Sequence, residues 1–254
     1  MNYRYVILTR FNLQYDESSR NLDEAWLCSR IDLLEQYTMP SVQAQENQQF
    51  EWFILLDNRT PESARQHLNH LAKNYPRMQL VAVAARGDKQ LQEFYTSFAH
   101  QLAMGYDGLI STRLDSDDVL LPSFTTEVLK HSNDEHFILS FPCGLQYFTK
   151  RELTFLIRYD HNHFLTFFEP VAVVNGALSY DHTKVASILP LVYADADTPM
   201  WEEIVHGENI LNGYQPSLHA RPVHPDRRHY TALIGMHISF RFKQVLRLLK
   251  RIAR

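Results

Sequence analysis

Apolar and polar residues alternate in a regular order along the first half of the chain. Short runs rich in β-branched and aromatic residues predict strands over residues 3–11, 50–57, 78–85 and 108–112. Stretches with helical spacing of apolar residues lie between and after them. They predict helices over residues 22–45, 58–75, 88–106 and 122–132. We expect Pro40 to end or kink the first helix, and Thr60 to cap the second, with Pro61 at its first helical position.

This order of elements predicts an α/β fold with a Rossmann-like, mostly parallel sheet and flanking helices. Ligands of such sheets bind beyond the carboxyl ends of the strands. Residues 1–134 form the half with this regular order, and residues 135–235 lose it, with short strands, loops and a helix near residues 182–189 expected there. We therefore expect one domain over residues 1–235, with a nucleotide-binding half and an acceptor-side half.

The composition of the chain argues against several classes of function. The 254 residues are 45% hydrophobic and 21% charged, with a formal net charge of −4, so the chain as a whole does not suit nucleic acid. It has eight glycines and no G-x-G-x-x-G sequence, which argues against a glycine-loop dinucleotide site. Two distant cysteines favour free thiols. Because it has neither a signal-type leader nor an apolar run of about 18 residues, we expect a cytoplasmic protein.

The candidate chemistry begins in the segment LISTRLDSDDVLLP, residues 109–122, where three aspartates follow an expected strand. Carboxylates two residues apart on an extended loop project to the same side, here those of Asp115 and Asp117. Two such groups can hold a hard divalent cation that also touches a diphosphate. The alternative is a solvated turn whose aspartates cap the helix that begins near Pro122.

The segment AMGYDGLISTRLDSDDVLLPSF resembles the D-x-D region of glycosyltransferases of the GT-A fold. Upstream, RIDLLEQYTMPSVQAQENQQFEWFILLD is similar to the bacterial rhamnosyltransferase family, and the likeness extends over most of residues 1–235. The resemblance implies a metal-dependent transferase, of inverting type, that moves a sugar such as rhamnose from a dTDP-, UDP- or GDP-sugar. The acceptor would be a glycan or a lipid-linked sugar, and the cofactor Mn²⁺ or Mg²⁺.

The same resemblance implies roles for individual residues. Asp115 would contact the ribose or the metal, Asp117 would be the principal metal ligand, and Asp118 would orient the loop. The remaining nucleotide-sugar pocket would be lined from the ends of the first three strands and by the arginine before the aspartates: Thr9, Arg10, Asn12, Asp57, Arg86 and Arg113. Surface ion pairs are the alternative for the arginines.

An inverting transfer needs a base that deprotonates the acceptor hydroxyl. Residues 198–209 offer Glu202, Glu203 and Glu208, and Pro199 predicts that they lie near a helix start. At most one of the two adjacent glutamates then faces the site. Trp201 would stack on a sugar face. The alternative is an acidic helix start that is solvated and favoured by the helix dipole.

Histidines and arginines gather later in the chain. A late histidine completes the metal shell in many GT-A enzymes, and His224 is our first candidate, with His219 and His206 behind it. Arg227 and Arg228 would clamp the diphosphate, because arginine suits bidentate contacts to phosphate. Surface histidines and a solvated basic turn are the alternatives.

The C-terminal residues 236–254 carry six basic residues and no acid, and their apolar residues form one helical stripe. A basic amphipathic helix is typical of attachment to an anionic membrane surface, here the inner face of the cytoplasmic membrane. Packing on the body or on a partner is the alternative.

Two rival functions remain at this point. The segment LDSDDV, residues 114–119, also fits the D-x-D-x-V pattern of haloacid dehalogenase-like phosphatases, although that motif normally follows the first strand of the fold. A protein that binds sugar nucleotides or glycans without turnover is the other rival.

Overall fold

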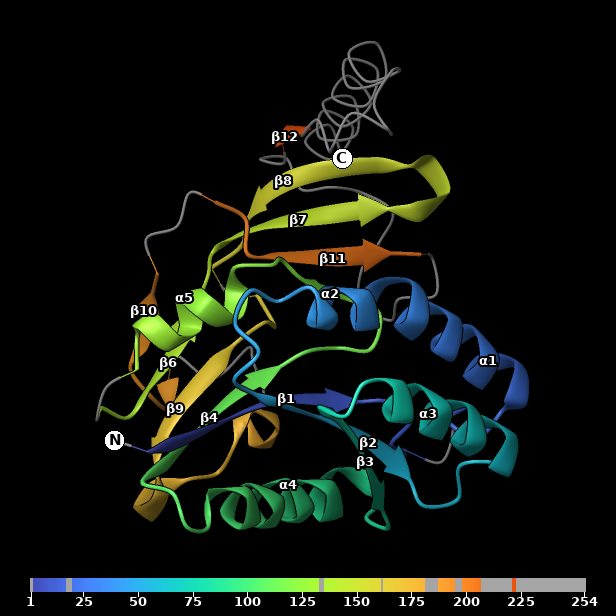
Figure 1. Ribbon diagram of the computed structural model, residues 1–254, viewed down its shortest axis with the longest axis horizontal. Coiled ribbons are helices and arrows are strands. Elements are labelled where there is room, and N and C mark those ends of the chain that lie inside the picture. The colour runs from blue at the N-terminus through green and yellow to red at the C-terminus, as the bar shows by residue number, and fades with distance from the viewer. Residues whose placement is uncertain are drawn as a thin grey trace, which may run out of the picture.

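The computed structural model of the chain describes residues 2–16, 20–132, 135–160, 162–180, 187–194, 198–206 and 221–222. Its centre is a seven-stranded sheet in the order β10-β6-β9-β4-β1-β2-β3 (Figure 1). Only β9 runs antiparallel to its neighbours β4 and β6. The strands are β1 (Tyr3–Arg10), β2 (Glu51–Asp57), β3 (Met78–Val83), β4 (Gly108–Arg113), β6 (Phe137–Ser140), β9 (Thr166–Pro170) and β10 (Leu191–Tyr193).

Helices cover both faces of this sheet because successive strand residues point to opposite sides. Ile7 and Ile54 pack with Leu27 of the first helix and Leu68 of α3, whereas Val6 lies on the other face, in the cluster that contains α4 side chains. The helices are α1 (Glu24–Leu33), the π-helical turn η1 (Leu34–Thr38), α2 (Met39–Gln43), α3 (Glu62–Asn74), α4 (Gly87–Ala103) and α5 (Phe124–Lys130). The predicted α/β class with a mostly parallel sheet and flanking helices is confirmed.

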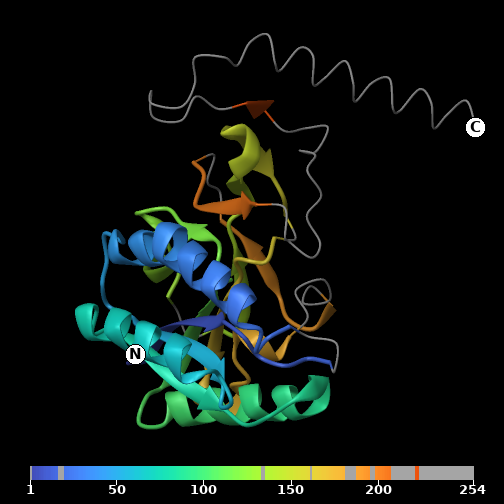
Figure 2. The same cartoon turned by 90° about the vertical axis from the view of Figure 1, so that its right-hand side faces the viewer.

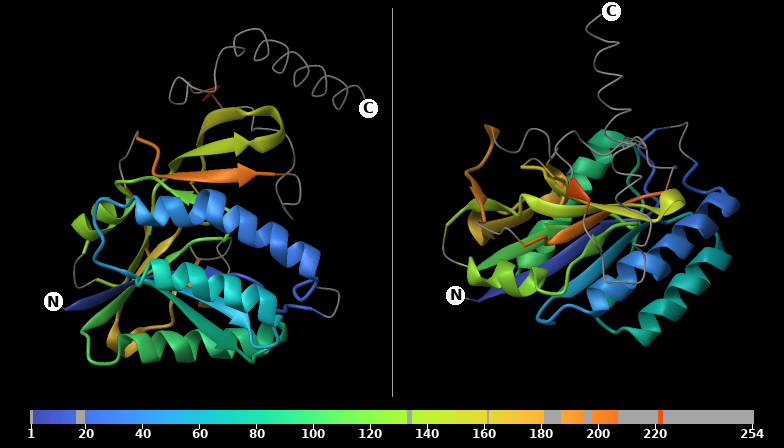
Figure 3. Two further views of the ribbon diagram at one scale, coloured as in Figure 1. Left: turned by 45° about the vertical axis from the view of Figure 1, so that its right-hand side comes forward. Right: turned by 90° about the horizontal axis from the view of Figure 1, so that it is seen from above.

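A second sheet of five short strands lies beside α1 and α2, in the order β12-β8-β7-β11-β5 (Figures 1 and 3). Its strands are β5 (Val119–Leu120), β7 (Cys143–Phe148), β8 (Leu153–Arg158), β11 (Trp201–Val205) and β12 (Arg221–Pro222). Short 3₁₀ turns span Thr149–Arg151, Val171–Val173 and Ala177–Ser179. The side view in Figure 2 shows this sheet above the seven-stranded one.

Three local predictions are wrong or incomplete. The segment after Pro199 is the strand β11, because Trp201 and Glu202 pair with β5 and residues 202–205 pair with β7. Thr60 does not cap α3, since its hydroxyl donates to the Asp57 carbonyl at 2.6 Å. The first helix does not end at Pro40. The widened turn η1 precedes this proline, which has no N–H to donate, and α2 continues beyond it.

Other predictions fall on residues outside the described ranges. These include most of the helix expected near residues 182–189 and the whole C-terminal helix over residues 236–254. Among the described residues, no helix is both long enough and apolar enough to cross a membrane. The two cysteines are free, Cys28 exposed and Cys143 buried.

Candidate functional site

The three aspartates lie in the loop that joins β4 to β5, at the carboxyl end of the central strand. Leu114 is buried, and its N–H donates to the Leu8 carbonyl at 3.1 Å, which extends the pairing of β4 with β1. The loop then turns, with the Asp118 N–H donating to the Asp115 carbonyl at 3.3 Å. The predicted position of this segment beyond a central parallel strand is therefore confirmed.

Asp115 is held by two arginines from two neighbouring strands. The Arg113 guanidinium reaches both carboxylate oxygens, at 3.3 and 3.1 Å, and Arg10 lies 3.4 Å from one of them. Arg10 also lies over the ring of Tyr15 and donates to its hydroxyl. Burial opposes ionisation, but the two guanidinium groups outweigh it and hold the pKa of Asp115 well below its usual range. Asp115 is therefore a carboxylate at neutral pH.

Asp117 is engaged on both of its oxygens. Arg30 of α1 donates to them at 3.0 and 2.8 Å, and the His206 Nε2 lies 2.9 Å from one of them. Arg30 also donates to the Ser116 hydroxyl at 2.6 Å. Burial would raise the pKa of Asp117, but the bonds from His206 and Arg30 lower it. These contacts fasten the loop to α1 on one side and to the end of β11 on the other.

Asp118 contacts a histidine and a backbone N–H in place of an arginine. His163 Nε2 lies 2.7 Å from one of its oxygens, and the Ile204 N–H donates to the other at 3.0 Å. Burial raises the pKa of Asp118 to about 7, and although burial opposes it, the bond to Asp118 raises the pKa of His163.

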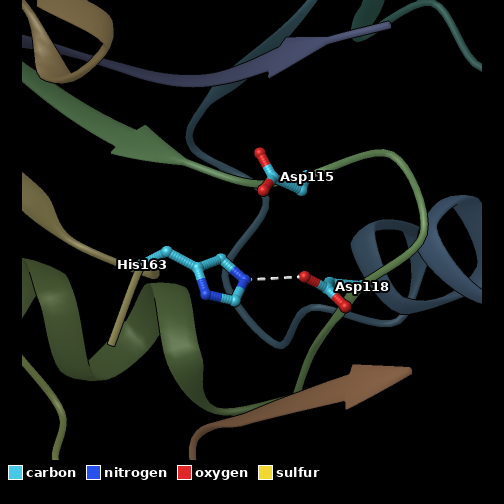
Figure 4. A group of neighbouring side chains, drawn as sticks. All are labelled: Asp115, Asp118 and His163. Atoms are coloured by element: carbon cyan, nitrogen blue, oxygen red, sulfur yellow. Dashed lines mark hydrogen bonds and ion pairs between the residues drawn. The ribbon is translucent and has the colours of Figure 1, made fainter. Parts of the chain in front are cut away.

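Asp115, Asp118 and His163 converge on one point. One ligand atom from each lies within 4.8 Å of the others, and Figure 4 shows His163 and Asp118 facing each other, with Asp115 beside them. Two carboxylate oxygens and an imidazole nitrogen suit Mn²⁺ or Mg²⁺, with open positions for phosphate oxygens. This set shares Asp115 with the set expected from the sequence. In place of Asp117 and His224 it has Asp118 and His163.

The residues expected to line the nucleotide pocket separate into two groups. Arg10 and Arg113 reach Asp115, and Arg86 is exposed and donates to the Asn58 side chain. Thr9 has no exposed surface and accepts the Trp52 indole N–H at 2.9 Å. Its expected place in the pocket is therefore wrong, and its role is to hold the core.

Asn12 and Asp57 form a buried network below the strand ends. The Asn12 side-chain amide donates to the Asn21 backbone carbonyl and to the Thr60 hydroxyl. The side-chain oxygen of Asn12 accepts the Asp57 N–H. Asp57 accepts from Arg59 and from the Asn21 amide. The exposed fraction is 1% for Asn12 and 2% for Asp57, so these side chains shape the strand ends from beneath and do not line a pocket.

The candidate bases lie on β11. Glu203 is buried and accepts the Gln146 amide at 2.6 Å, and Glu202 is partly buried beside β5. Burial raises the pKa of both, to about 7 for Glu202. Trp201 cannot stack on a sugar, because it is 1% exposed, stacks on Phe164 and donates its indole N–H to the Phe141 carbonyl.

Some sequence candidates lie outside the part of the chain that the structure describes: Glu208, His219, His224, Arg227 and Arg228. Conversely, sequence reasoning did not find Arg30 or His163. In the sequence Arg30 looks like any polar residue of a helix, and His163 lies in the loop before β9. Nothing near either residue marks it in the sequence; only the tertiary fold brings both to the aspartates.

Comparisons with known proteins give one family match and several structural similarities. A family model described as "Putative rhamnosyl transferase" matches residues 9–215. Among solved structures, TarS from S. aureus (residues 1–349) is similar over 79% of this chain and 60% of its own, with 8% identity and a TM-score of 0.47. The mannosyltransferase PcManGT from Pyrobaculum calidifontis, in complex with GDP-Man and Mn²⁺, is similar over 56% of this chain and 36% of its own, with 12% identity and a TM-score of 0.36. Comparison with curated proteins gives no match.

The family match is stronger evidence than the structural similarities. The family model covers most of the chain, whereas these structural similarities have TM-scores under 0.5, and the chain spans 60% of the TarS fragment. The assignment to a family therefore rests on the sequence match alone.

Proposed function

The chain belongs to this family of rhamnosyl transferases, and from that premise we propose that it transfers a sugar from a nucleoside diphosphate to a hydroxyl acceptor with the help of a divalent cation. The observation that carries the proposal is the convergence of Asp115, Asp118 and His163 beyond the carboxyl end of β4. A divalent cation held there would neutralise charge on the departing diphosphate. The imidazole of His163 favours Mn²⁺ over Mg²⁺, because Mg²⁺ prefers oxygen ligands.

Arg10 and Arg113 are placed to receive the diphosphate. Both already contact Asp115, and planar guanidinium groups bind phosphate oxygens well. We expect each to exchange part of its contact with Asp115 for a phosphate oxygen when the donor binds.

Glu203 is the base that we favour on β11. Gln146 donates to its buried carboxyl and orients it. The charge of His163 lowers its pKa against the larger effect of burial, as expected for a carboxyl near the cation cluster. As ionised Glu203 takes the proton of the acceptor hydroxyl, the oxygen bonds to the anomeric carbon. The bond from that carbon to the diphosphate oxygen breaks, and the diphosphate leaves with the electron pair. Attack from the face opposite the leaving group inverts the anomeric carbon.

Calorimetry with UDP, dTDP and GDP, each with and without Mn²⁺, tests the donor site. We expect one nucleotide to bind only with Mn²⁺, and Asp118→Asn to abolish that binding. The exposed Asp32 of α1 supplies the control, because Asp32→Asn removes a carboxylate of the same type away from the cluster. If no nucleotide binds under either condition, the proposal fails, and hydrolysis of a phosphate ester would then favour the phosphatase.

Finer parts of the proposal need separate tests. Rhamnose as the donor sugar is tested by transfer from dTDP-rhamnose, and inversion by the anomeric configuration of the product. Attachment of residues 236–254 to an anionic membrane is tested by sedimentation of the full chain with phosphatidylglycerol vesicles, with phosphatidylcholine vesicles as the control.

A further inference from the structure

Two tyrosines and a glutamate lie together where η1 meets the second sheet. The rings of Tyr37 and Tyr147 have centroids 6.4 Å apart and are inclined by 58°, and both side chains are partly buried. Tyr37 comes from the turn between α1 and α2, and Tyr147 comes from β7. Figures 1 and 3 show α1 and α2 running directly beneath β11 and β7.

Glu202 belongs to the same group. Leu145 and Glu202 are opposite each other in the parallel pair of β7 and β11, as are Tyr147 and Ile204, so Glu202 and Tyr147 project from the same face of the sheet. Burial raises the pKa of Tyr37 and of Tyr147, and the charge of Glu202 adds to the rise at both tyrosines.

Glu202 differs from the other acids near the loop because it has no partner of its own. Within the described ranges no hydrogen bond or ion pair reaches its carboxylate, and none reaches the hydroxyl of Tyr37 or Tyr147. None of these oxygens is among the buried polar atoms without a partner, so all three groups are open to water and to a ligand that replaces it. Three unused polar groups beside two aromatic rings therefore indicate a binding site.

The group also adjoins the proposed donor site. Glu202 pairs with Val119, which directly follows Asp118 in the chain, and the charge of Asp118 acts on Glu202. A molecule held by the two rings would thus lie next to the loop that holds the cation cluster. The Glu202 carboxylate and the two phenol oxygens offer polar contacts to such a molecule, and the tyrosine rings offer an apolar surface.

We propose that Tyr37, Tyr147 and Glu202 form a subsite for a pyranose ring of the acceptor. A pyranose presents an apolar face of C–H groups that packs on aromatic rings, and hydroxyls that donate to a carboxylate and to phenol oxygens. This inference rests on the proposed function, because it treats the bound sugar as the acceptor of that transfer.

Saturation-transfer NMR with methyl α-L-rhamnopyranoside, methyl β-D-glucopyranoside and methyl β-D-galactopyranoside tests the subsite without any donor. We expect at least one glycoside to bind the full chain. Tyr147→Leu and Glu202→Gln should each weaken that glycoside roughly threefold to tenfold. Tyr147→Phe should retain most of the affinity, because it keeps the ring. Unchanged nucleotide binding by Tyr147→Leu shows that its loss of glycoside binding is not a failure to fold.

Tyr193 supplies the matched control, since it is exposed on the edge strand β10 of the other sheet and Tyr193→Leu should leave glycoside binding unchanged. The same variants are titrated with nucleotide and Mn²⁺, and we expect no change there. Equal glycoside binding by wild type and the Tyr147→Leu and Glu202→Gln variants, or no binding of any glycoside by wild type, overturns the subsite. If wild type does not bind nucleotide with Mn²⁺, the donor site is overturned instead, so the two failures are distinguishable.

Discussion

Acidic residues that contact an arginine and acidic residues that do not have opposite pKa shifts, even within the single loop after β4. Asp57, Asp115 and Asp117 each contact at least one arginine, and the pKa of each is lowered. Asp118, Glu169 and Glu203 are also buried, and there burial raises the pKa of the carboxyl. The difference shows that burial alone does not decide the charge of a carboxyl; the neighbouring cation does.

This contrast matches what each region is proposed to do. Asp115, which two arginines hold ionised, is ready to receive a cation and to release the arginines to a diphosphate. Burial raises the pKa of Glu203, which makes its carboxylate a stronger base toward the proton of an acceptor hydroxyl. Both sets are preorganised by the fold, because their partners come from different elements. Changing one partner at a time should therefore break the contrast.

The largest effect is expected from Arg30→Ala. The variant leaves the Asp117 carboxylate buried with only His206 beside it, and loss of one partner of a buried ion pair is strongly destabilising. We expect the free energy of unfolding in urea at pH 7 to fall by about 2–4 kcal/mol. Arg30→Ala combined with Asp117→Asn should recover part of the loss. A fall below about 1 kcal/mol would show that the pair contributes no more than a surface one.

Glu169→Gln tests the opposite environment, at the end of β9. Glu169 is fully buried and accepts the N–H groups of Asn175 and Gly176, with His136 at 3.9 Å. Burial raises its pKa from 4.5 to about 7. The folded state therefore binds this proton more tightly than the unfolded state does, and wild type should lose stability as the pH rises from about 4.5 to 7.

The expected loss in wild type is about 1–3 kcal/mol between pH 5 and 8, and Glu169→Gln should remove that slope. The measurement is the unfolding free energy of both proteins over this range, and the difference between them cancels the other titrating groups. Parallel curves for the two proteins would contradict the raised pKa. Tyr180 also senses the charge of Glu169, so its ring signal in near-ultraviolet circular dichroism supplies a second readout.

Arg10→Met sharpens the contrast within the proposed donor site. Arg10 lies 3.4 Å from Asp115, so its positive charge repels a cation held by that carboxylate. In the absence of nucleotide we expect Mn²⁺ to bind roughly fivefold more tightly to the variant, which corresponds to about 1 kcal/mol. Nucleotide binding with Mn²⁺ should weaken, because a phosphate partner is lost. Calorimetric titrations with Mn²⁺ alone and then with nucleotide separate the two effects, and weaker binding of Mn²⁺ alone would contradict the argument.

Local sequence signals predicted the first half of the fold well. Each of β1 to β4 is a run of apolar, β-branched or aromatic residues, and the helices between them have amphipathic spacing, so both periods could be read directly. The loop with Asp115 followed from this order, because a parallel sheet places its functional loops at the carboxyl ends of its strands.

The second half could not be read in the same way. Residues 201–205 form a strand only because β5 and β7 flank them, and pairing between distant segments has no local signature. Three partners of the aspartates were missed for the same reason, because Arg30, His163 and Ile204 are far from the loop in sequence. Thr9 and Asn12 were misplaced because a polar residue at a strand end can equally well satisfy buried groups.

The smallest effect is expected from Glu62→Gln, which removes an arginine-paired acid at the surface. Glu62 lies in the first turn of α3 and pairs with Arg65 at 2.6 Å, and their side chains are 63% and 44% exposed. Water screens this pair, so its loss should lower the unfolding free energy by only about 0.3–0.5 kcal/mol, including the favourable position of an acid at a helix start. In 1 M NaCl the difference should vanish, whereas the loss in Arg30→Ala should persist, because salt does not screen a buried pair. Urea unfolding of both variants at low and high salt measures this directly. If both losses vanish in salt, the Arg30–Asp117 pair behaves like an exposed one, and the distinction between the strand-end acids and ordinary surface acids no longer holds.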